Sequence, residues 1–358
     1  MSTPTRILIV RLGAMGDIIH AMPAVLLLRS IFPQSQIGWV IESRWSELLR
    51  SEPDAQPLSE QQPLVDFVHL VDTRKWRKNF LGGESRRQAL AALREVRPMK
   101  YDLAIDFQGA IKSAAVAKLS GAKQIYGFAD PWEKPATVFY AKKIPTSSVH
   151  VVERNFDLAA AAGDAEDGAK LDCNTQPKLP KESVVEAKIR EKLQALGLHQ
   201  GFVLLNPGAG WGAKQWPAER YAKIARVLGQ DGLRSLVNFG PGEEWLAKIV
   251  EEEARGSAVA AQFSISELIA VTRRASLFIG GDTGPLHLAA ALKIPIVALF
   301  GPTDPARTGP CGTLSIVLRN PHSITSHKRN RETEAGLMNI SAEQVIAVAR
   351  ELLGKAGA

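Results

Sequence analysis

A pattern of strand, loop, helix and strand at residues 277–300 constrains the fold more than any other part of the chain. Its first apolar run stops at two glycines, and the polar residues Asp282 and Thr283 follow. A helix-like apolar run carrying His287 comes next, and a second strand-like run occupies residues 294–300. This order places polar groups at the carboxyl end of a strand, beside the free N–H groups of a helix N-terminus, where α/β proteins hold phosphates. The segment therefore predicts a cradle for a nucleotide diphosphate.

The rest of the chain repeats this alternation. Near-continuous apolar strands alternating with helices are typical of a parallel sheet covered on both faces. Polar, proline-bearing sequence at about residues 164–180 separates two such series, and a length of 358 residues also favours two domains. We predict an α/β protein with two similar domains, at residues 1–170 and 171–335, and a cleft between them. A helix within residues 336–358, capped by Ser341, is expected to pack back on the first domain.

Composition bounds the class of protein. Hydrophobic residues make up 45% of the chain, so each domain can bury a substantial core. The apolar run at residues 7–10 is too short for a signal-peptide core or a membrane span, so we expect a soluble cytoplasmic protein. Cys173 and Cys311 stand far apart without a partner motif, which argues against a disulfide framework or a zinc cluster. A net charge of +7 favours a polyanionic partner or an anionic membrane face.

The first glycine loop, at residues 11–17, follows the first strand-like run and ends in Asp17. The loop lacks the G-x-G-x-x-G fingerprint of a dinucleotide site, so a nicotinamide oxidoreductase is disfavoured. Asp17 is a lone carboxylate at the carboxyl end of a strand, where it would face the cleft as a general base. The alternative interpretation is a helix N-cap, where aspartate is favoured because it satisfies free N–H groups.

Two loops in the second half are candidates for holding a nucleotide. Residues 206–217 follow a strand and contain three glycines, which allow close backbone approach. Lys214 adds a mobile positive charge for a diphosphate, unless it is an ordinary solvated turn lysine. Residues 239–244 end another strand, and Glu243 or Glu244 suits ribose hydroxyls, although a plain helix start with acidic residues explains them equally well.

Two basic clusters complete the candidates. Residues 74–80 interleave cations with aromatic residues, and residues 327–331 form a second cluster. Each is either a solvated face or a contact for an anionic acceptor or a membrane surface. Nucleic-acid binding would rest on charge alone, so we do not expect it. No D-x-D sequence occurs, so we expect no metal, and Lys214, Thr283 and backbone N–H groups would stabilise a leaving diphosphate.

Four motifs occur together and in order along the chain. They are Arg-Leu-Gly-Ala-Met-Gly-Asp-Ile-Ile-His at residues 11–20, Tyr-Asp-Leu-Ala-Ile-Asp-Phe-Gln-Gly-Ala-Ile-Lys-Ser at 101–113, Lys-Gln-Trp-Pro at 214–217 and Gly-Asp-Thr-Gly-Pro-Leu-His at 281–287. Through them the chain resembles, over nearly its whole length, the lipopolysaccharide heptosyltransferases. That family consists of inverting glycosyltransferases with two Rossmann-like domains in the GT-B architecture. The Met-Gly-Asp and Gln-Gly-x-x-Lys-Ser segments look most like the heptosyltransferase I group.

The resemblance implies a function. It implies transfer of heptose from ADP-heptose to the Kdo sugar on lipid A, without a metal or another cofactor. The first domain would bind the acceptor and the second domain the nucleotide. The protein would act as a monomer, bound peripherally to the anionic cytoplasmic face of the inner membrane.

The resemblance also assigns site residues position by position. Asp17 matches the proposed general base. The donor-binding positions are Gly13, Ala14, Lys214, Glu243, Glu244, Asp282, Thr283, Gly284, Pro285 and His287. Only one of the two glutamates would contact the ribose, and the spacing does not decide which. The acceptor-binding positions are Arg74, Lys75, Arg77, Lys78, Gln108 and Lys112.

Both glycine loops depart from the family pattern. Gly13 and Ala14 stand where the family often has hydroxyl residues, so backbone N–H groups would have to contact the donor there. Residues 208–210 show the same departure, which leaves the identity of the donor open. The alternatives are heptosyltransferase II chemistry, another nucleotide sugar, or a non-catalytic protein that binds nucleotide sugars or polyanions and in which Asp17 only caps a helix.

Overall fold

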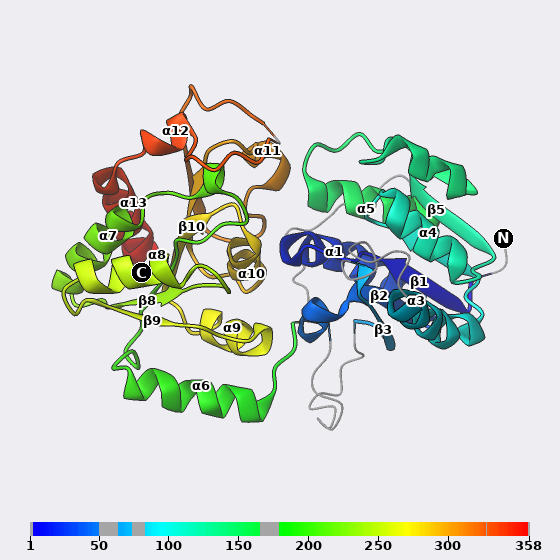
Figure 1. Ribbon diagram of the computed structural model, residues 1–358, viewed down its shortest axis with the longest axis horizontal. Helices are drawn as coiled ribbons and strands as arrows, with labels where there is room; N and C mark the ends of the chain where they lie inside the picture. The colour runs from blue at the N-terminus through cyan, green and yellow to red at the C-terminus, as the bar shows by residue number, and fades with distance from the viewer. Residues whose placement is uncertain (1–2, 50–63, 74–82, 165–178, 327, 357–358) are drawn as a thin grey trace. The chain divides into compact units, whose positions relative to one another are not determined.

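The computed structural model describes residues 3–49, 64–73, 83–164, 179–326 and 328–356. The chain divides into two compact units, unit 1 at residues 1–180 and unit 2 at residues 181–358. The boundary expected after residue 170 lies outside the described residues, and the observed division falls at Pro180. Each unit is a parallel sheet with helices on both faces, so the predicted α/β class with two Rossmann-like domains is confirmed (Figure 1).

The sheet of unit 1 has the strand order β3-β2-β1-β4-β5-β6. Its inner strands are apolar apart from residues near their ends, because both faces of a doubly covered parallel sheet are buried. Ile9 of β1, for example, is fully buried and pairs with Trp39 of β2 and Ile105 of β4. The strands are β1 (Arg6–Val10), β2 (Gln36–Glu42), β3 (Phe67–Val71), β4 (Leu103–Asp106), β5 (Gln124–Phe128) and β6 (Lys142–Ile144).

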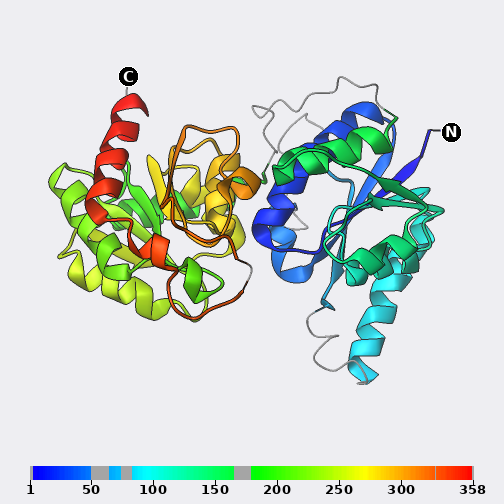
Figure 2. The same cartoon turned by 90° about the horizontal axis from the view of Figure 1, so that it is seen from above.

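Helices cover the two faces of this sheet (Figure 2). α1 is apolar almost all round and packs against α5, as expected of a helix buried on several sides. On the opposite face, α3, α4 and η3 share one core cluster with Leu8 and Val10 of β1. The described helices of unit 1 are α1 (Met15–Ile31), α3 (Gly83–Val96), α4 (Ile111–Leu119) and α5 (Val151–Ala162), with short 3₁₀ helices η1 (Ser43–Leu48), η2 (Arg97–Met99) and η3 (Lys134–Phe139).

The sheet of unit 2 has the order β12-β11-β10-β7-β8-β9. One core cluster joins it to α7, α8 and α13, and a second joins its other face to α6, α9 and α10. The strands are β7 (Val203–Asn206), β8 (Ser235–Asn238), β9 (Ala258–Ala261), β10 (Leu277–Gly281), β11 (Ile296–Phe300) and β12 (Ser315–Arg319). The helices are α6 (Ser183–Ala195), η4 (Gly212–Lys214), α7 (Ala218–Gln230), α8 (Glu244–Glu253), α9 (Ile265–Thr272), α10 (Gly284–Ala291), α11 (Pro305–Thr308), α12 (Ala335–Met338) and α13 (Ala342–Ala356).

The last helix, α13, begins with the expected cap. Ser341 N donates to Gln344 Oε1 at 2.8 Å, and Gln344 N donates to Ser341 Oγ at 3.2 Å. Its apolar residues Val345, Ala349 and Leu352 are buried in the core of unit 2 with α7. From the sequence we expected this helix to pack back on the first domain. In the structure its apolar stripe packs into the core of unit 2 beside α7, and packing on the first domain stays a prediction.

The two sheets have the same strand order when the strands are counted from the first of each unit. The order reverses between β1 and β4 in unit 1, and between β7 and β10 in unit 2. In open α/β sheets, ligands bind at the carboxyl ends of the strands beside such a reversal. The loops and helix starts that follow these four strands contain most of the described candidate residues, and Glu243 and Glu244 follow β8. No described helix is long and apolar enough to cross a bilayer.

Candidate functional site

Lys214, Asp282 and His287 converge beside the reversal of strand order in unit 2. Lys214 ends η4, Asp282 follows β10 directly, and His287 lies in α10. Lys214 Nζ lies 2.6 Å from Asp282 Oδ2 and also donates to the Asp282 carbonyl at 3.2 Å. His287 Nε2 lies 3.1 Å from the other carboxylate oxygen, Oδ1. The structure thus joins residues that the sequence places in two separate loops.

This cluster is nearly closed to solvent. Asp282 and His287 are buried, and the Lys214 side chain is 14% exposed. Burial alone would raise the pKa of Asp282, but the hydrogen bond and charge of His287 and the ammonium of Lys214 outweigh it and hold that pKa well below its usual range. The carboxylate therefore stays ionised and fixes the ammonium. A lysine ammonium has three donors, so one remains for a phosphate oxygen.

The N-terminus of α10 lies beside the same cluster. Thr283 is the N-cap, and Gly284 and Pro285 form the first turn. Thr283 Oγ1 donates to the Gly281 carbonyl at 3.2 Å. Pro285 fits this position because a first-turn residue needs no backbone N–H. The unpaired N–H groups and the positive dipole end of a helix start both favour an anion, so the turn suits a diphosphate next to a lysine ammonium.

The glycine loop after β7 approaches the start of α8. A Cβ atom at Gly208 would lie 2.0 Å from a carboxylate oxygen of Glu243, so no side chain fits at Gly208 in this arrangement. Glu243 is half-buried and accepts a hydrogen bond from Gly240 N at 2.9 Å. Glu244 is exposed and accepts one from Gly242 N. Of the two glutamates that the sequence left undecided, Glu243 is the one beside the glycine loop.

Two buried asparagines end β7 and β8 below this loop. Asn238 Nδ2 donates to Asn206 Oδ1 at 2.7 Å, and Asn206 Nδ2 donates to the Gly208 carbonyl at 3.0 Å. They fix the start of the loop because the Asn206 amide is engaged at both ends, by Asn238 and by the Gly208 carbonyl. We predicted no role for this pair from the sequence. An asparagine at the last position of two successive apolar strands is the signal that could have found it.

Residues 330–334 hold the turn that carries the lysine of the cluster. Glu334 N donates to the Ala213 carbonyl at 3.1 Å, and Thr333 Oγ1 donates to the Gln215 carbonyl at 2.8 Å. This segment overlaps the basic cluster at residues 327–331, for which the sequence suggests a solvated face or an anionic contact. Part of it has a structural role, because the backbone carbonyl of Asn330 accepts the Ala213 N–H next to Lys214.

Asp17 of unit 1 lies in the first turn of α1, three residues after the N-cap Ala14. Its Oδ2 accepts the Ala14 N–H at 3.0 Å, and its Oδ1 lies 2.8 Å from Nη2 of Arg11. Asp17 is therefore not the N-cap itself, although it satisfies the N–H of the N-cap residue. The side chain is still 44% exposed. A carboxylate has about four lone-pair sites, so two contacts leave room for a guest hydroxyl.

Arg11 ties Asp17 to the loop after β4. Its Nη1 donates to the Phe107 carbonyl at 2.6 Å. In the same loop, Gln108 Oε1 accepts the Leu12 N–H at 3.0 Å. The loops after β1 and β4 are therefore joined on both sides of the Arg11 guanidinium. Gln108 lies at the predicted edge of the sheet, with its amide oxygen engaged by the first glycine loop.

Asp106, the last residue of β4, organises this second loop. It is fully buried and accepts hydrogen bonds from Tyr140 Oη at 2.7 Å, Ser113 Oγ at 2.9 Å, Gln108 N at 2.9 Å and Gly109 N at 3.2 Å. Burial raises the pKa of Asp106, and these hydrogen bonds offset the effect only in part. In the sequence Asp106 stands within one of the four motifs, and we predicted no role for it. An aspartate at the last position of an apolar strand is the sequence signal that could have indicated such a role.

The remaining candidates are described only in part. Lys112 is an exposed residue at the start of α4. Gly13 packs against the indole of Trp45 in η1. Among the described residues, no group of three or more His, Cys, Asp or Glu side chains is placed to hold a metal ion. Four predicted acceptor residues lie outside the described residues, namely Arg74, Lys75, Arg77 and Lys78.

The sequence profile of glycosyltransferase family 9 (heptosyltransferase) matches residues 89–338. The chain belongs to this family. The matched range includes the loop after β4 and the whole Lys214–Asp282–His287 cluster, and it begins after Asp17. The resemblance to the heptosyltransferases seen in the sequence is therefore confirmed, and so is its place among the glycosyltransferases.

Individual family members are similar over most of their length. Lipopolysaccharide heptosyltransferase 1 of Pseudomonas aeruginosa is 30% identical over 322 residues, covering 87% of this chain and 83% of the relative. Lipopolysaccharide heptosyltransferase 1 of Escherichia coli K12 is 28% identical, with 88% and 94% covered. Lipopolysaccharide heptosyltransferase 3 of the same organism is 27% identical, with 94% and 95% covered.

Solved structures agree with this family 9 assignment. Escherichia coli heptosyltransferase WaaC with ADP superposes with a TM-score of 0.76 at 26% identity, covering 97% of this chain and 99% of WaaC. Escherichia coli ADP-heptose lps heptosyltransferase II gives a TM-score of 0.77 at 19% identity, covering 99% and 100%, which supports the fold alone.

Proposed function

We propose that this chain is an inverting glycosyltransferase that moves heptose from ADP-heptose to the Kdo sugar of the lipopolysaccharide inner core. Unit 2 binds the donor, and Asp17 of unit 1 is the general base. The observation that carries the proposal is the buried Lys214–Asp282–His287 cluster beside the start of α10. WaaC has been solved with ADP and with ADP-2-deoxy-2-fluoro heptose, which supports the same class of donor here.

The proposed reaction is a single displacement. The acceptor hydroxyl oxygen forms a bond to the anomeric carbon of the heptose while the bond from that carbon to the β-phosphate oxygen breaks. The hydroxyl proton passes to the Asp17 carboxylate, and ADP leaves with the electron pair. Lys214 and the first-turn N–H groups of α10 stabilise the negative charge that develops on the diphosphate. Attack from the side opposite the leaving group inverts the anomeric configuration.

The surroundings of Asp17 suit this role. Arg11 and the Ala14 N–H each hold one carboxylate oxygen, so the side chain has a defined orientation while 44% of it stays exposed. Arg11 is a positioning residue, because its guanidinium also binds the Phe107 carbonyl and cannot turn without losing that contact. A base fixed in this way needs little reorganisation when the acceptor hydroxyl arrives.

The remaining roles follow from placement and charge. Glu243, next to the glycine loop, contacts the donor ribose, and the exposed Glu244 does not. Gln108 and Lys112 contact the acceptor, whose carboxylate and phosphates are anionic, together with the basic residues at 74–78. Because this acceptor is anchored in lipid, the reaction takes place at the cytoplasmic face of the inner membrane.

Product analysis tests the proposal. Purified protein incubated with ADP-heptose and Kdo–lipid A is expected to give a product heavier by one heptose in mass spectrometry, with an inverted anomeric centre by NMR. An acceptor that already carries heptose tests transfer of the second or third heptose, which the similarity to heptosyltransferase 3 favours as a second candidate. UDP-sugars and GDP-sugars test the donor. Stabilisation by ADP-heptose without product on any acceptor would contradict catalysis and favour a binding protein.

A further inference from the structure

One face of unit 1 exposes large apolar side chains. We call it the α3–α4 face, and it consists of the exposed residues of α3, η2 and α4 and of residues 132–138. Its exposed apolar residues are Leu90, Ile111, Leu119, Trp132 and Val138. Trp132 is 64% exposed, although burying an indole is strongly favourable. In unit 2 the described apolar residues of this kind are scattered over separate elements, at Val184, Trp245, Leu314, Ile324 and Met338.

Cations lie among these apolar side chains on both helices. On α3, Arg87, Leu90 and Arg94 are exposed at positions i, i+3 and i+7, which places them on one side of the helix. On α4, Ile111 and Lys118 are exposed and lie two turns apart on one side. On each of the two helices, one exposed side therefore carries both apolar side chains and positive charge.

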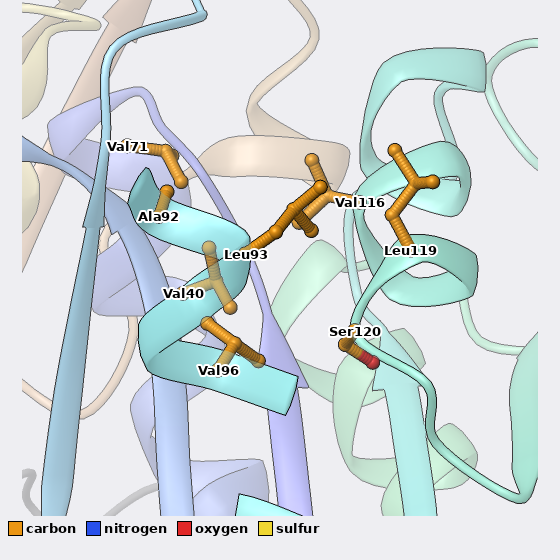
Figure 3. Close-up of a pocket in the computed structure, with 8 residues that line it drawn as sticks. All are labelled: Val40, Val71, Ala92, Leu93, Val96, Val116, Leu119 and Ser120. Carbon is orange, nitrogen blue, oxygen red and sulfur yellow. The ribbon is translucent and has the colours of Figure 1, made fainter. Parts of the chain in front are cut away.

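Hydrogen bonds connect the elements of the face. Arg97 Nε in η2 donates to the Leu119 carbonyl at the end of α4, at 2.9 Å. Ile111 N at the start of α4 donates to Glu133 Oε2 at 2.7 Å. Between α3 and α4 lies an apolar hollow of about 40 Å³, room for about three water-sized groups (Figure 3). Its lining is valine, leucine and alanine apart from Ser120, so it favours hydrocarbon over water.

The charge of the face is strongly one-sided. Its exposed cations are Arg87, Arg94, Arg97, Lys112, Lys118 and Lys134. Among the described residues of the same elements, Glu95 is the only exposed carboxylate. The half-buried Glu133 is already engaged by the Ile111 N–H. The occupant that complements this face is therefore negatively charged and offers hydrocarbon as well.

We propose that the α3–α4 face docks on an anionic lipid bilayer. Its cations contact headgroup phosphates, while Leu90, Leu119 and Trp132 enter the interfacial layer, where tryptophan is favoured. A protein partner fits less well, because the centres of protein interfaces are poor in lysine and other charged residues. Only the purpose of the docking rests on the proposed function, in which the acceptor is anchored in lipid.

Vesicle binding by the full-length protein tests the charges. The protein is expected to bind vesicles of phosphatidylcholine with phosphatidylglycerol, and to bind phosphatidylcholine alone much more weakly. The triple variant Arg87→Glu, Arg94→Glu, Lys118→Glu should lower the partition coefficient by about 10²-fold. The control variant Arg190→Glu, Lys248→Glu, Arg255→Glu makes the same charge change at exposed sites of unit 2 and should stay within about twofold. Absence of binding, or an equal loss in both variants, overturns the proposal.

Fluorescence quenching tests the apolar contact. Brominated lipids in anionic vesicles should quench part of the tryptophan emission, and Trp132→Phe should remove that quenching. Trp245→Phe, at an exposed position of α8, should leave it in place. Quenching that survives in Trp132→Phe overturns the assigned surface. Turnover on a water-soluble Kdo oligosaccharide should be equal in all these variants, so failure of docking and failure of the transfer reaction are separate results.

Discussion

Asp106 of unit 1 and Asp282 of unit 2 stand at the ends of corresponding strands, β4 and β10, in sheets of the same strand order. Asp106 accepts hydrogen bonds from neutral donors, namely a phenol, a hydroxyl and two backbone N–H groups. The Asp282 carboxylate instead contacts the ammonium of Lys214 and the imidazole of His287. Burial therefore dominates at Asp106 and raises its pKa, whereas the partners dominate at Asp282 and lower its pKa.

The difference shows that one topological position serves two purposes. In unit 1 the buried carboxylate shapes a loop, and a separate aspartate, Asp17, stays partly exposed and is the proposed general base. In unit 2 the buried carboxylate fixes the Lys214 ammonium, which is the proposed contact for the diphosphate. Function in these two units therefore depends on what surrounds the strand ends, and the shared fold does not determine it.

The largest expected effect comes from the exposed aspartate of unit 1. Asp17→Asn keeps the size of the side chain but cannot accept the hydroxyl proton, so kcat should fall by about 10²–10⁴-fold. Donor affinity, measured by calorimetry with ADP, should hardly change, because the variant leaves unit 2 untouched. An Asp17→Asn enzyme that keeps full turnover would remove this residue from the mechanism.

The next effect should appear in donor affinity. Lys214→Met removes a charged contact worth about 1.5–3 kcal/mol, so the Kd for ADP should rise about 10–100-fold. Lys248→Met is the matched control, since Lys248 pairs with Glu252 on the exposed side of α8 at 3.6 Å. The control should bind ADP as the unchanged protein does. Equal affinities in Lys214→Met and the control would refute the diphosphate site.

The smallest expected effect is a difference between the two buried aspartates in how their contributions to stability depend on pH. Asp106 has a raised folded pKa, so its contribution to stability is present below the unfolded pKa of about 3.9 and is lost as pH rises through the folded pKa. Asp282 has a lowered folded pKa, so its contribution is present above about 3.9 and is lost as pH falls. A tenfold difference in proton affinity between the folded and unfolded states corresponds to about 1.4 kcal/mol of unfolding free energy.

Denaturant unfolding of Asp106→Asn and Asp282→Asn against the unchanged protein measures these contributions, because asparagine does not titrate. The difference in unfolding free energy should shrink with rising pH for Asp106→Asn and with falling pH for Asp282→Asn. If both differences change in the same direction, the contrast between the two sites is wrong.

Much of the fold could be predicted from the sequence because strand ends are marked locally. Apolar runs that stop at glycine identify β1, β7 and β10, and the run Ser341 to Gln344 identifies the start of α13. Other elements lack such marks and were not predicted. β5 includes Gly127, and β6 is three residues long with two lysines, so neither shows a clear apolar pattern.

The site was predicted less completely because its contacts are long-range. The sequence indicates that Lys214 and Asp282 each follow a strand, but the pairing of β7 with β10 and the support of the lysine turn by a distant segment are seen only in the structure. Likewise, Tyr140 reaches Asp106 across 34 positions, and no local pattern announces that contact. The place of α13 depends on which sheet has an uncovered face, which is a property of the folded unit.

The support of the Lys214 turn by residues 330–334 has a consequence for biosynthesis. Thr333 and its partner Gln215 are separated by 118 positions, so the loop leaves the ribosome long before the segment that shapes it. A nascent chain can pair β7 with β8 early, yet the lysine turn reaches its final form only after residues 330–334 have been translated. In the proposed function, nucleotide recognition therefore has to wait until this later segment of the chain has been synthesised.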